Sequence, residues 1–150
     1  TSVKQKFKKR VSDGKNEALV FDDNFIIDDD LATAIAQSGK PASSTVLLLS
    51  DCCHSGSIYD LQTGNYGGQK MPENIMSISA ARDSETAKQT SVGGNDQGIF
   101  TFYFYKLLSE DATLTPKKMQ STIGQYLKRF EQSYVCYSTT ESLLDKTIFQ

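Results

Sequence analysis

The residues best suited to chemistry form a short polar segment that follows an apolar run. Thr45–Ser50 is β-branched at its start and apolar throughout, which predicts a buried strand, and residues 51–56 read Asp-Cys-Cys-His-Ser-Gly. In an open α/β sheet, binding and catalytic groups lie at the carboxyl ends of the strands. A thiol placed there beside small residues suits a nucleophile, and Cys52 and Cys53 are both candidates. A buried, inert cysteine is the alternative.

A cysteine nucleophile needs a base that manages protons during acyl transfer, and that base is usually a histidine. The chain contains one histidine, His54. Because adjacent side chains diverge, we expect His54 to orient the loop and not to act as the base for Cys53. A zinc site is disfavoured because no second ligand pair stands at finger-like spacing, and a phosphatase because the loop lacks an arginine. A redox switch between Cys52 and Cys53 would need a strained vicinal disulfide.

The surrounding pattern predicts strands that alternate with helices. Asp28–Asp30 precedes an apolar-periodic stretch with Gly39 after it, which predicts a helix with acidic N-cap residues and a glycine stop. Thr115 and Pro116 predict the start of another helix, because proline is favoured in the first turn. Strand–helix–strand order is typical of a parallel α/β sheet. We expect strands at 17–21, 45–50, 74–79 and 134–137, helices at 31–37, 100–108 and 115–130, and loops at 1–16, 56–73 and 83–98.

Composition and charge are those of an ordinary globular protein, and we expect one domain over residues 1–150. The net charge of −2 gives no general attraction to nucleic acid or to an anionic membrane, and no apolar run approaches the length of a membrane span. The three cysteines do not make a disulfide framework, which favours a reducing, cytoplasmic location. No signal peptide is recognisable, and because the chain does not begin with methionine we expect it to be a fragment or a processed product.

Several segments, in order along the chain, resemble the metacaspases, which are caspase-like cysteine peptidases. Residues 51–57 resemble the family's Asp-x-Cys-His-Ser-Gly signature, and residues 98–101 resemble its Gly-x-Phe-Thr helix start. Residues 13–20 and 27–31 resemble its acidic segment, and residues 78–87 resemble the next strand with its substrate-side loop. The short spacing after the cysteine resembles type I members. The resemblance implies a caspase-like α/β fold, a mainly parallel sheet with helices on both faces, whose first strands lie outside this chain.

The resemblance also implies a function, a calcium-stimulated cysteine endopeptidase that cleaves after Arg or Lys. It matches Cys53 to the nucleophile and Asp51 to the pocket that receives the basic P1 side chain, where a partly desolvated carboxylate selects a cation. A cap at the end of the strand is the alternative for Asp51. Substrate contacts are implied at Ala80 and Asp83. The implied calcium ligands are Asp13, Asp29, Asp30 and Asp60, which supply the hard oxygen donors that calcium prefers.

The chain departs from the family in its catalytic base, which lies in a His-Gly motif upstream of the acidic segment. No such histidine is present, so we expect it outside this chain. The alternative is a catalytically inactive, calcium-responsive regulatory domain of the same fold. Lys88 stands where the family often has an acid. We expect peptide substrates, no organic cofactor, no nucleic-acid or membrane partner, and a monomer. The basic segment 4–10 is expected to be a solvated loop, with self-cleavage or polyanion binding as alternatives.

Overall fold

The computed structural model describes most of the chain. The described residues are 2–4, 15–20, 24–51, 59, 61, 65–66, 69–80, 89–92 and 95–149. The strands are β1 (Ser2–Lys4), β2 (Lys15–Val20), β3 (Phe25–Ile27), β4 (Val46–Ser50), β5 (Asn65–Tyr66), β6 (Gln69–Lys70), β7 (Ile75–Ala80), β8 (Gln89–Val92), β9 (Asn95–Gly98) and β10 (Tyr134–Ser138). The helices are α1 (Asp28–Ala36), α2 (Ile99–Glu110) and α3 (Pro116–Leu127), with short 3₁₀ helices at Lys128–Phe130 and Glu141–Asp145.

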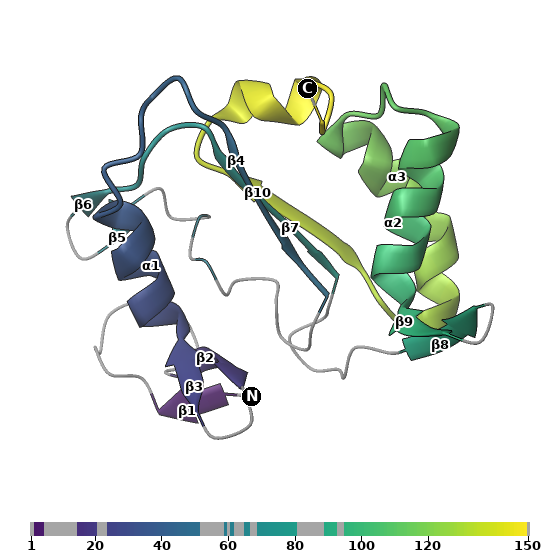
Figure 1. The fold of residues 1–150 in the computed structure, drawn as a ribbon, viewed down its shortest axis with the longest axis horizontal. Helices are drawn as coiled ribbons and strands as arrows, with labels where there is room; N and C mark the ends of the chain where they lie inside the picture. Colours follow the sequence, from purple (N-terminus) through teal and green to yellow (C-terminus); the bar gives the residue numbers. More distant parts are fainter. Residues whose placement is uncertain are drawn as a thin grey trace.

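The central sheet has three strands in the order β10-β7-β4, and β4 ends directly before Asp51 (Figure 1). β4 pairs with β7 in parallel, from Val46 opposite Ile75 to Ser50 opposite Ser79. β10 pairs antiparallel with the other side of β7, so its first residue lies opposite the last residue of β7. The carboxyl ends of β4 and β7 and the start of β10 therefore share one edge of the sheet. The mixed α/β class is confirmed, but within the described residues the sheet is mixed and not mainly parallel.

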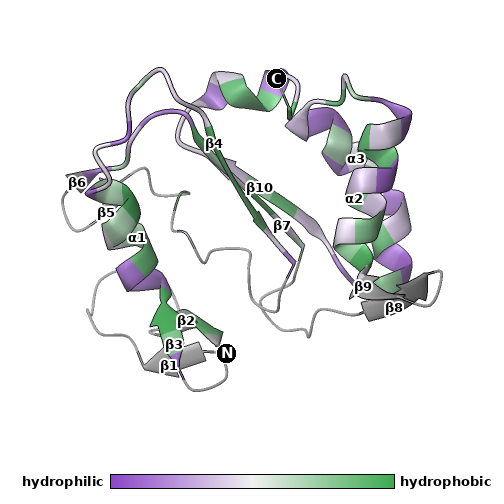
Figure 2. Ribbon diagram, viewed as in Figure 1, coloured by the Kyte–Doolittle hydropathy of each residue, from purple (hydrophilic) through white to green (hydrophobic). Residues whose placement is uncertain are grey.

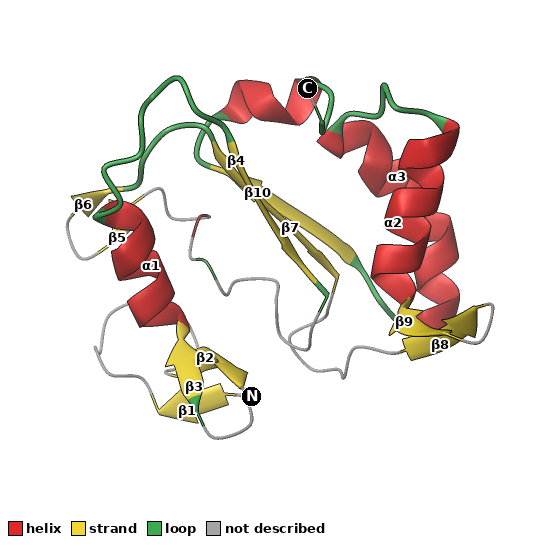
Figure 3. Cartoon of the chain, in the orientation of Figure 1, coloured by secondary structure: helices red, strands yellow, loops and turns green. Residues whose placement is uncertain are grey.

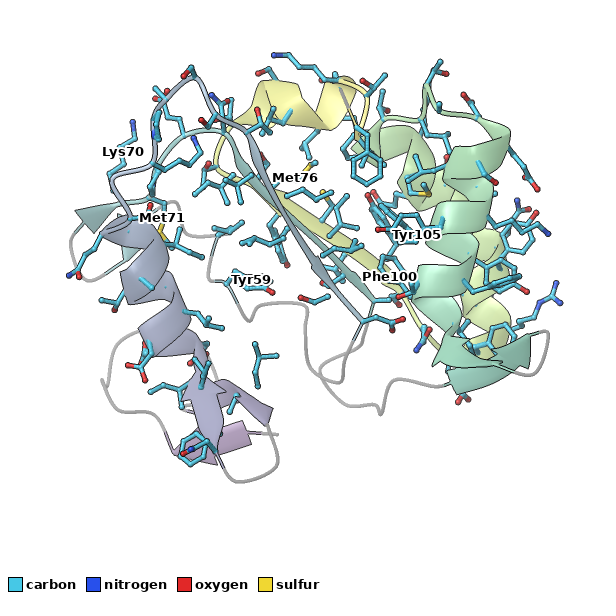
Figure 4. All side chains as sticks on the ribbon, in the orientation of Figure 1. Tyr59, Lys70, Met71, Met76, Phe100 and Tyr105 are labelled. Carbon is cyan, nitrogen blue, oxygen red and sulfur yellow. The ribbon has the colours of Figure 1, made fainter. Side chains whose placement is uncertain are left out.

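Apolar side chains alternate across β4 and divide the core into two clusters on opposite faces of the sheet. Leu47 and Leu49 pack against the larger cluster, which includes α2, α3, β7 and β10. Val46 and Leu48 pack against the smaller cluster, which includes α1 and Tyr59. Figure 2 shows β4 and β7 as apolar strands, and Figure 4 shows Phe100 on the α2 side of the sheet. Helices on both faces, as predicted, follow from this alternation.

Helix α3 forms where capping and periodicity agree. The side chain of Thr115 accepts a hydrogen bond from the Lys118 N–H at 3.2 Å, and Pro116 occupies the first turn, as predicted. Met119, Ile123 and Leu127 recur every four residues and are fully buried against the sheet. The helix ends at Leu127 and passes into a 3₁₀ helix, so the predicted helix to residue 130 is three residues too long as α-helix.

The structure overturns several predictions made from local pattern. β2 does not join the parallel sheet; it lies between β1 and β3 in a separate antiparallel sheet (Figure 3). The segments predicted as loops contain β1, the β5–β6 hairpin and the β8–β9 hairpin. These strands have two to four residues and polar sequences, so they carry no hydrophobic alternation that could reveal them.

The start of α1 also differs from the prediction. Its N-cap is Ile27, and the three aspartates occupy the first helical turn, where acidic side chains favour the positive end of the helix dipole. The carboxylate Oδ1 of Asp28 accepts a hydrogen bond from the N–H of Asp29 at 2.8 Å. The chain leaves the helix through Gly39, whose φ of +62° lies in the left-handed region that favours glycine. None of the helices in the described part of the chain is both long and apolar enough to cross a bilayer.

Candidate functional site

Asp51 lies at the predicted position, directly after β4 at the carboxyl edge of the central sheet. Its carboxylate reaches the start of α2, fifty residues further along the chain. Oδ2 accepts one hydrogen bond from the backbone N–H of Thr101 at 3.1 Å and a second from Oγ1 of Thr101 at 2.7 Å. Both lone pairs of Oδ2 are therefore engaged by one residue of α2.

This contact makes Asp51 the N-cap group of α2. The N-cap residue of the helix is Gly98, which has extended φ and ψ of −61° and 136° and no side chain to cap with. Thr101 is the third residue of the helix, and its N–H is one that an N-cap side chain normally binds. A Cβ added to Gly98 would fall inside the Asp51 carboxylate. The carboxylate therefore occupies the place of the missing cap side chain, and glycine is required at position 98 by close approach.

The second carboxylate oxygen of Asp51 is in a different situation. Oδ1 is buried, and within the described part of the chain it has no hydrogen-bond partner. A buried acceptor without a partner costs about 1–3 kcal/mol, and more when it is charged. Oδ2 of Asp51 thus caps a helix that begins far along the chain, and the pocket role of Asp51 stays a prediction.

A second polar contact closes the end of β4. The buried Ser50 hydroxyl lies 2.8 Å from the hydroxyl of Tyr59, and the two exchange a hydrogen bond. Ser50 pairs with Ser79 on β7, which is also buried. Small polar residues thus line the ends of both parallel strands. Tyr59 follows the cysteines in the chain, and this bond joins it to the end of β4.

Ala80 and Asp83 were implied as substrate-binding residues. Ala80 is the last residue of β7 and lies at the same edge of the sheet as Asp51. Its side chain is fully buried in the cluster beneath α2 and α3, so a contact with substrate would have to come from its backbone. Asp83 lies outside the described residues. The substrate role of both residues stays a prediction.

The predicted calcium ligands are only partly placed. Asp29 and Asp30 are adjacent in the first turn of α1, where Asp29 is buried and Asp30 is exposed. Asp13 and Asp60 lie outside the described residues. The described segments bring together no group of three or more histidine, cysteine or acidic side chains that could hold a metal ion. The calcium site therefore stays a prediction.

The cysteines fall into two groups. Cys52 and Cys53 lie outside the described residues, as does His54, so the nucleophile assignment stays a prediction. Cys136 lies on β10, half-buried and in thiol form. Burial raises the pKa of the Cys136 thiol to about 11. Because the thiolate is the reactive form, Cys136 is an unreactive thiol at neutral pH.

Sequence reasoning from the residues alone missed the role of Thr101 and Gly98. The signal was the glycine, which stands directly before an aromatic helix and has no capping side chain. Helix-capping rules consider only residues near the start of the helix. They could not identify Asp51 as the capping residue, because it lies fifty residues away in the chain. Comparison with known proteins adds no identity, since no family model and no curated protein matches the chain.

Proposed function

We propose that this chain is part of a cysteine endopeptidase of caspase-like fold that cleaves peptide bonds after Arg or Lys. The observation that carries the proposal is the Asp51 carboxylate at the carboxyl edge of β4. Its Oδ1 is buried and has no partner in the described structure, and it stands in the chain directly before the two thiols. A desolvated carboxylate in such a place favours a positively charged side chain over a neutral or an acidic one.

In the proposed reaction the thiolate of Cys53 attacks the carbonyl carbon of the scissile bond. Backbone N–H groups near Cys53 stabilise the oxyanion that forms. A histidine from outside these 150 residues gives a proton to the leaving amine, which departs and leaves a thioester. Water then adds to the thioester, the histidine takes its proton, and the thiolate is released with a carboxylate product.

The proposed caspase-like fold is supported by the composition of β4. Parallel strands that are apolar on both faces are normally covered on both faces and paired on both edges. β4 contacts an apolar cluster on each face, yet within the described chain it pairs only with β7. A further parallel strand beside β4 would bury its half-exposed side chains. The proposal places that strand, like the histidine, outside this chain.

Calcium is part of the proposal as an activator. Asp13, Asp29, Asp30 and Asp60 are the proposed ligands, and they would supply carboxylate oxygens of the kind that calcium binds. The support is the acidic first turn of α1, in which Asp29 is buried. Calcium bound there would fix the start of α1.

A second function is favoured by the histidine count. The only histidine in these 150 residues is His54, which is adjacent to the proposed nucleophile. If the full-length protein has no other, the fold would serve as a calcium-responsive regulatory domain without peptidase activity. Reading the full-length sequence for a histidine that follows a strand separates the two functions.

The test is an active-site assay on the full-length protein. Peptides that end in Arg, Lys or Asp before a fluorogenic group are incubated with wild type, Cys53→Ala and Cys136→Ala, and the rate of cleavage is measured. We expect cleavage of the basic peptides, a loss of at least about a thousandfold in Cys53→Ala, and full activity in Cys136→Ala, since the half-buried thiol on β10 takes no part. Full activity of Cys53→Ala would overturn the nucleophile assignment, and cleavage after Asp alone would overturn the substrate class.

A further inference from the structure

We propose that Thr101 is a positioning residue that limits Asp51 to one available oxygen and thereby sets the balance between Arg and Lys at P1. The inference rests on the proposed function, because it concerns the basic side chain that Asp51 would receive. It adds a residue on α2 and a mechanism of selectivity to that function.

The carboxylate of Asp51 is held in one orientation by α2. The backbone N–H of Thr101 is fixed by the helix, and it binds Oδ2 at 3.1 Å. The Thr101 hydroxyl binds the same oxygen at 2.7 Å. The backbone at Gly98 lies so close to this carboxylate that a single added carbon would overlap it. Rotation of the carboxylate would break both bonds, so Oδ1 is the one oxygen left for a ligand.

This arrangement affects Arg and Lys differently. A guanidinium group gains its advantage over an ammonium group by donating two parallel hydrogen bonds, one to each oxygen of a carboxylate. Thr101 already fills the lone pairs of Oδ2, so that fork is not available at Asp51. An ammonium group needs only one oxygen and loses nothing. We therefore expect wild type to use matched Arg and Lys peptides with kcat/KM values within about fivefold of each other, since each cation makes a single charged contact.

Substitution of Thr101 by valine releases half of this restraint. Valine keeps the branched shape and the backbone N–H but removes the hydroxyl, so one lone pair of Oδ2 becomes available. Arg can then donate to both oxygens, and we expect the Arg-to-Lys ratio of kcat/KM to rise by about tenfold, the value of one added hydrogen bond. Thr101→Ser keeps the hydroxyl and should keep the wild-type ratio.

The experiment measures kcat/KM for one Arg peptide and one Lys peptide of otherwise identical sequence, on the full-length protein. Thr122→Val is the matched control. Its hydroxyl donates a hydrogen bond to the Lys118 carbonyl on α3, at 2.9 Å, so its loss should leave the ratio unchanged. A ratio that rises in Thr101→Val and returns in Thr101→Ser supports the inference.

Three results would overturn it, and they are distinguishable from one another. Equal loss of both activities in Thr101→Val, with an unchanged ratio, would mean that Thr101 only stabilises the fold. A wild-type preference for Arg above about fiftyfold would mean that both carboxylate oxygens are already available, and this result needs no variant. Absence of cleavage after either basic residue would remove the proposed function together with the inference.

Discussion

Replacement of Gly98 by alanine tests whether Asp51 takes the cap position of α2. The added methyl would fall inside the Asp51 carboxylate, so the carboxylate must move away from Thr101. Two hydrogen bonds to Oδ2 are then lost. Loss of an N-cap group costs about 0.5–2 kcal/mol, and a hydrogen bond to a charged group is worth about 1.5–3 kcal/mol. Water can form hydrogen bonds in place of some of those that are lost, which reduces the cost. We therefore expect Gly98→Ala to lower the free energy of unfolding by about 2–4 kcal/mol.

Urea unfolding of the full-length protein measures this change, and Gly124→Ala is its control. Gly124 lies within α3, and a Cβ there would meet no atom within 4 Å. Because glycine is unfavourable inside a helix, Gly124→Ala should raise the free energy of unfolding by about 0.5–1 kcal/mol. The same substitution is thus expected to have opposite signs at the two positions.

A double-mutant cycle shows whether the cost at Gly98 comes from Asp51. In an Asp51→Ala background the carboxylate is absent, so the added methyl has space, and Gly98→Ala should cost less than about 1 kcal/mol. The coupling energy between the two positions should therefore exceed about 1 kcal/mol. A cost of Gly98→Ala below about 0.5 kcal/mol, or the same cost in both backgrounds, would mean that Asp51 does not cap α2.

The remaining predictions concern the core, the buried thiol and the metal. Phe104 is fully buried beside the half-exposed Tyr105, so we expect Phe104→Ala to cost about 3–5 kcal/mol and Tyr105→Ala less than about 1 kcal/mol in urea unfolding; equal costs would contradict the packing. Burial raises the pKa of Cys136 to about 11, so its alkylation by iodoacetamide in the folded protein should be slow at pH 8 and accelerate toward pH 11. The stability that this protonated thiol contributes is full below the pKa of the unfolded thiol and is lost as the pH rises through about 11. Rapid alkylation of Cys136 at pH 8 would contradict this burial. Removal of calcium with EGTA should suppress peptide cleavage, and Asp29→Asn should weaken the response to added calcium; unchanged rates in excess EGTA would remove the metal from the proposal.

Much of the central sheet could be predicted from the sequence because its elements carry strong local signals. β4 and β7 are apolar runs bounded by polar residues, and α3 combines a threonine cap, a first-turn proline and a four-residue apolar spacing. Strand partners could not be predicted in the same way. β2 has the composition of a strand, but its residues do not indicate which strand it pairs with. It pairs with β1 and β3, whereas the sequence suggested a place in the same sheet as β4. Pairing depends on contacts between distant segments, which local periodicity does not contain.

The candidate site was predicted to a similar extent. The position of Asp51 follows from the end of an apolar strand, and the structure confirms that it lies at the carboxyl edge of the sheet. Its bond to Thr101 could not be predicted, because it joins two segments fifty residues apart. The fully buried side chain of Ala80 was also unexpected, since a strand end can turn either face to the core.

The most direct test of the central claim compares Asp51→Asn with wild type on Arg and Lys peptides. Asparagine caps helices as well as aspartate does, so the variant should keep the bonds to Thr101 and unfold within about 1 kcal/mol of wild type. It removes the negative charge that the proposal uses to select a cation. We predict that kcat/KM for both basic peptides falls by at least about thirtyfold, the lower value expected when one member of a buried charge pair is lost. Undiminished cleavage after Arg and Lys in a folded Asp51→Asn protein would contradict the account.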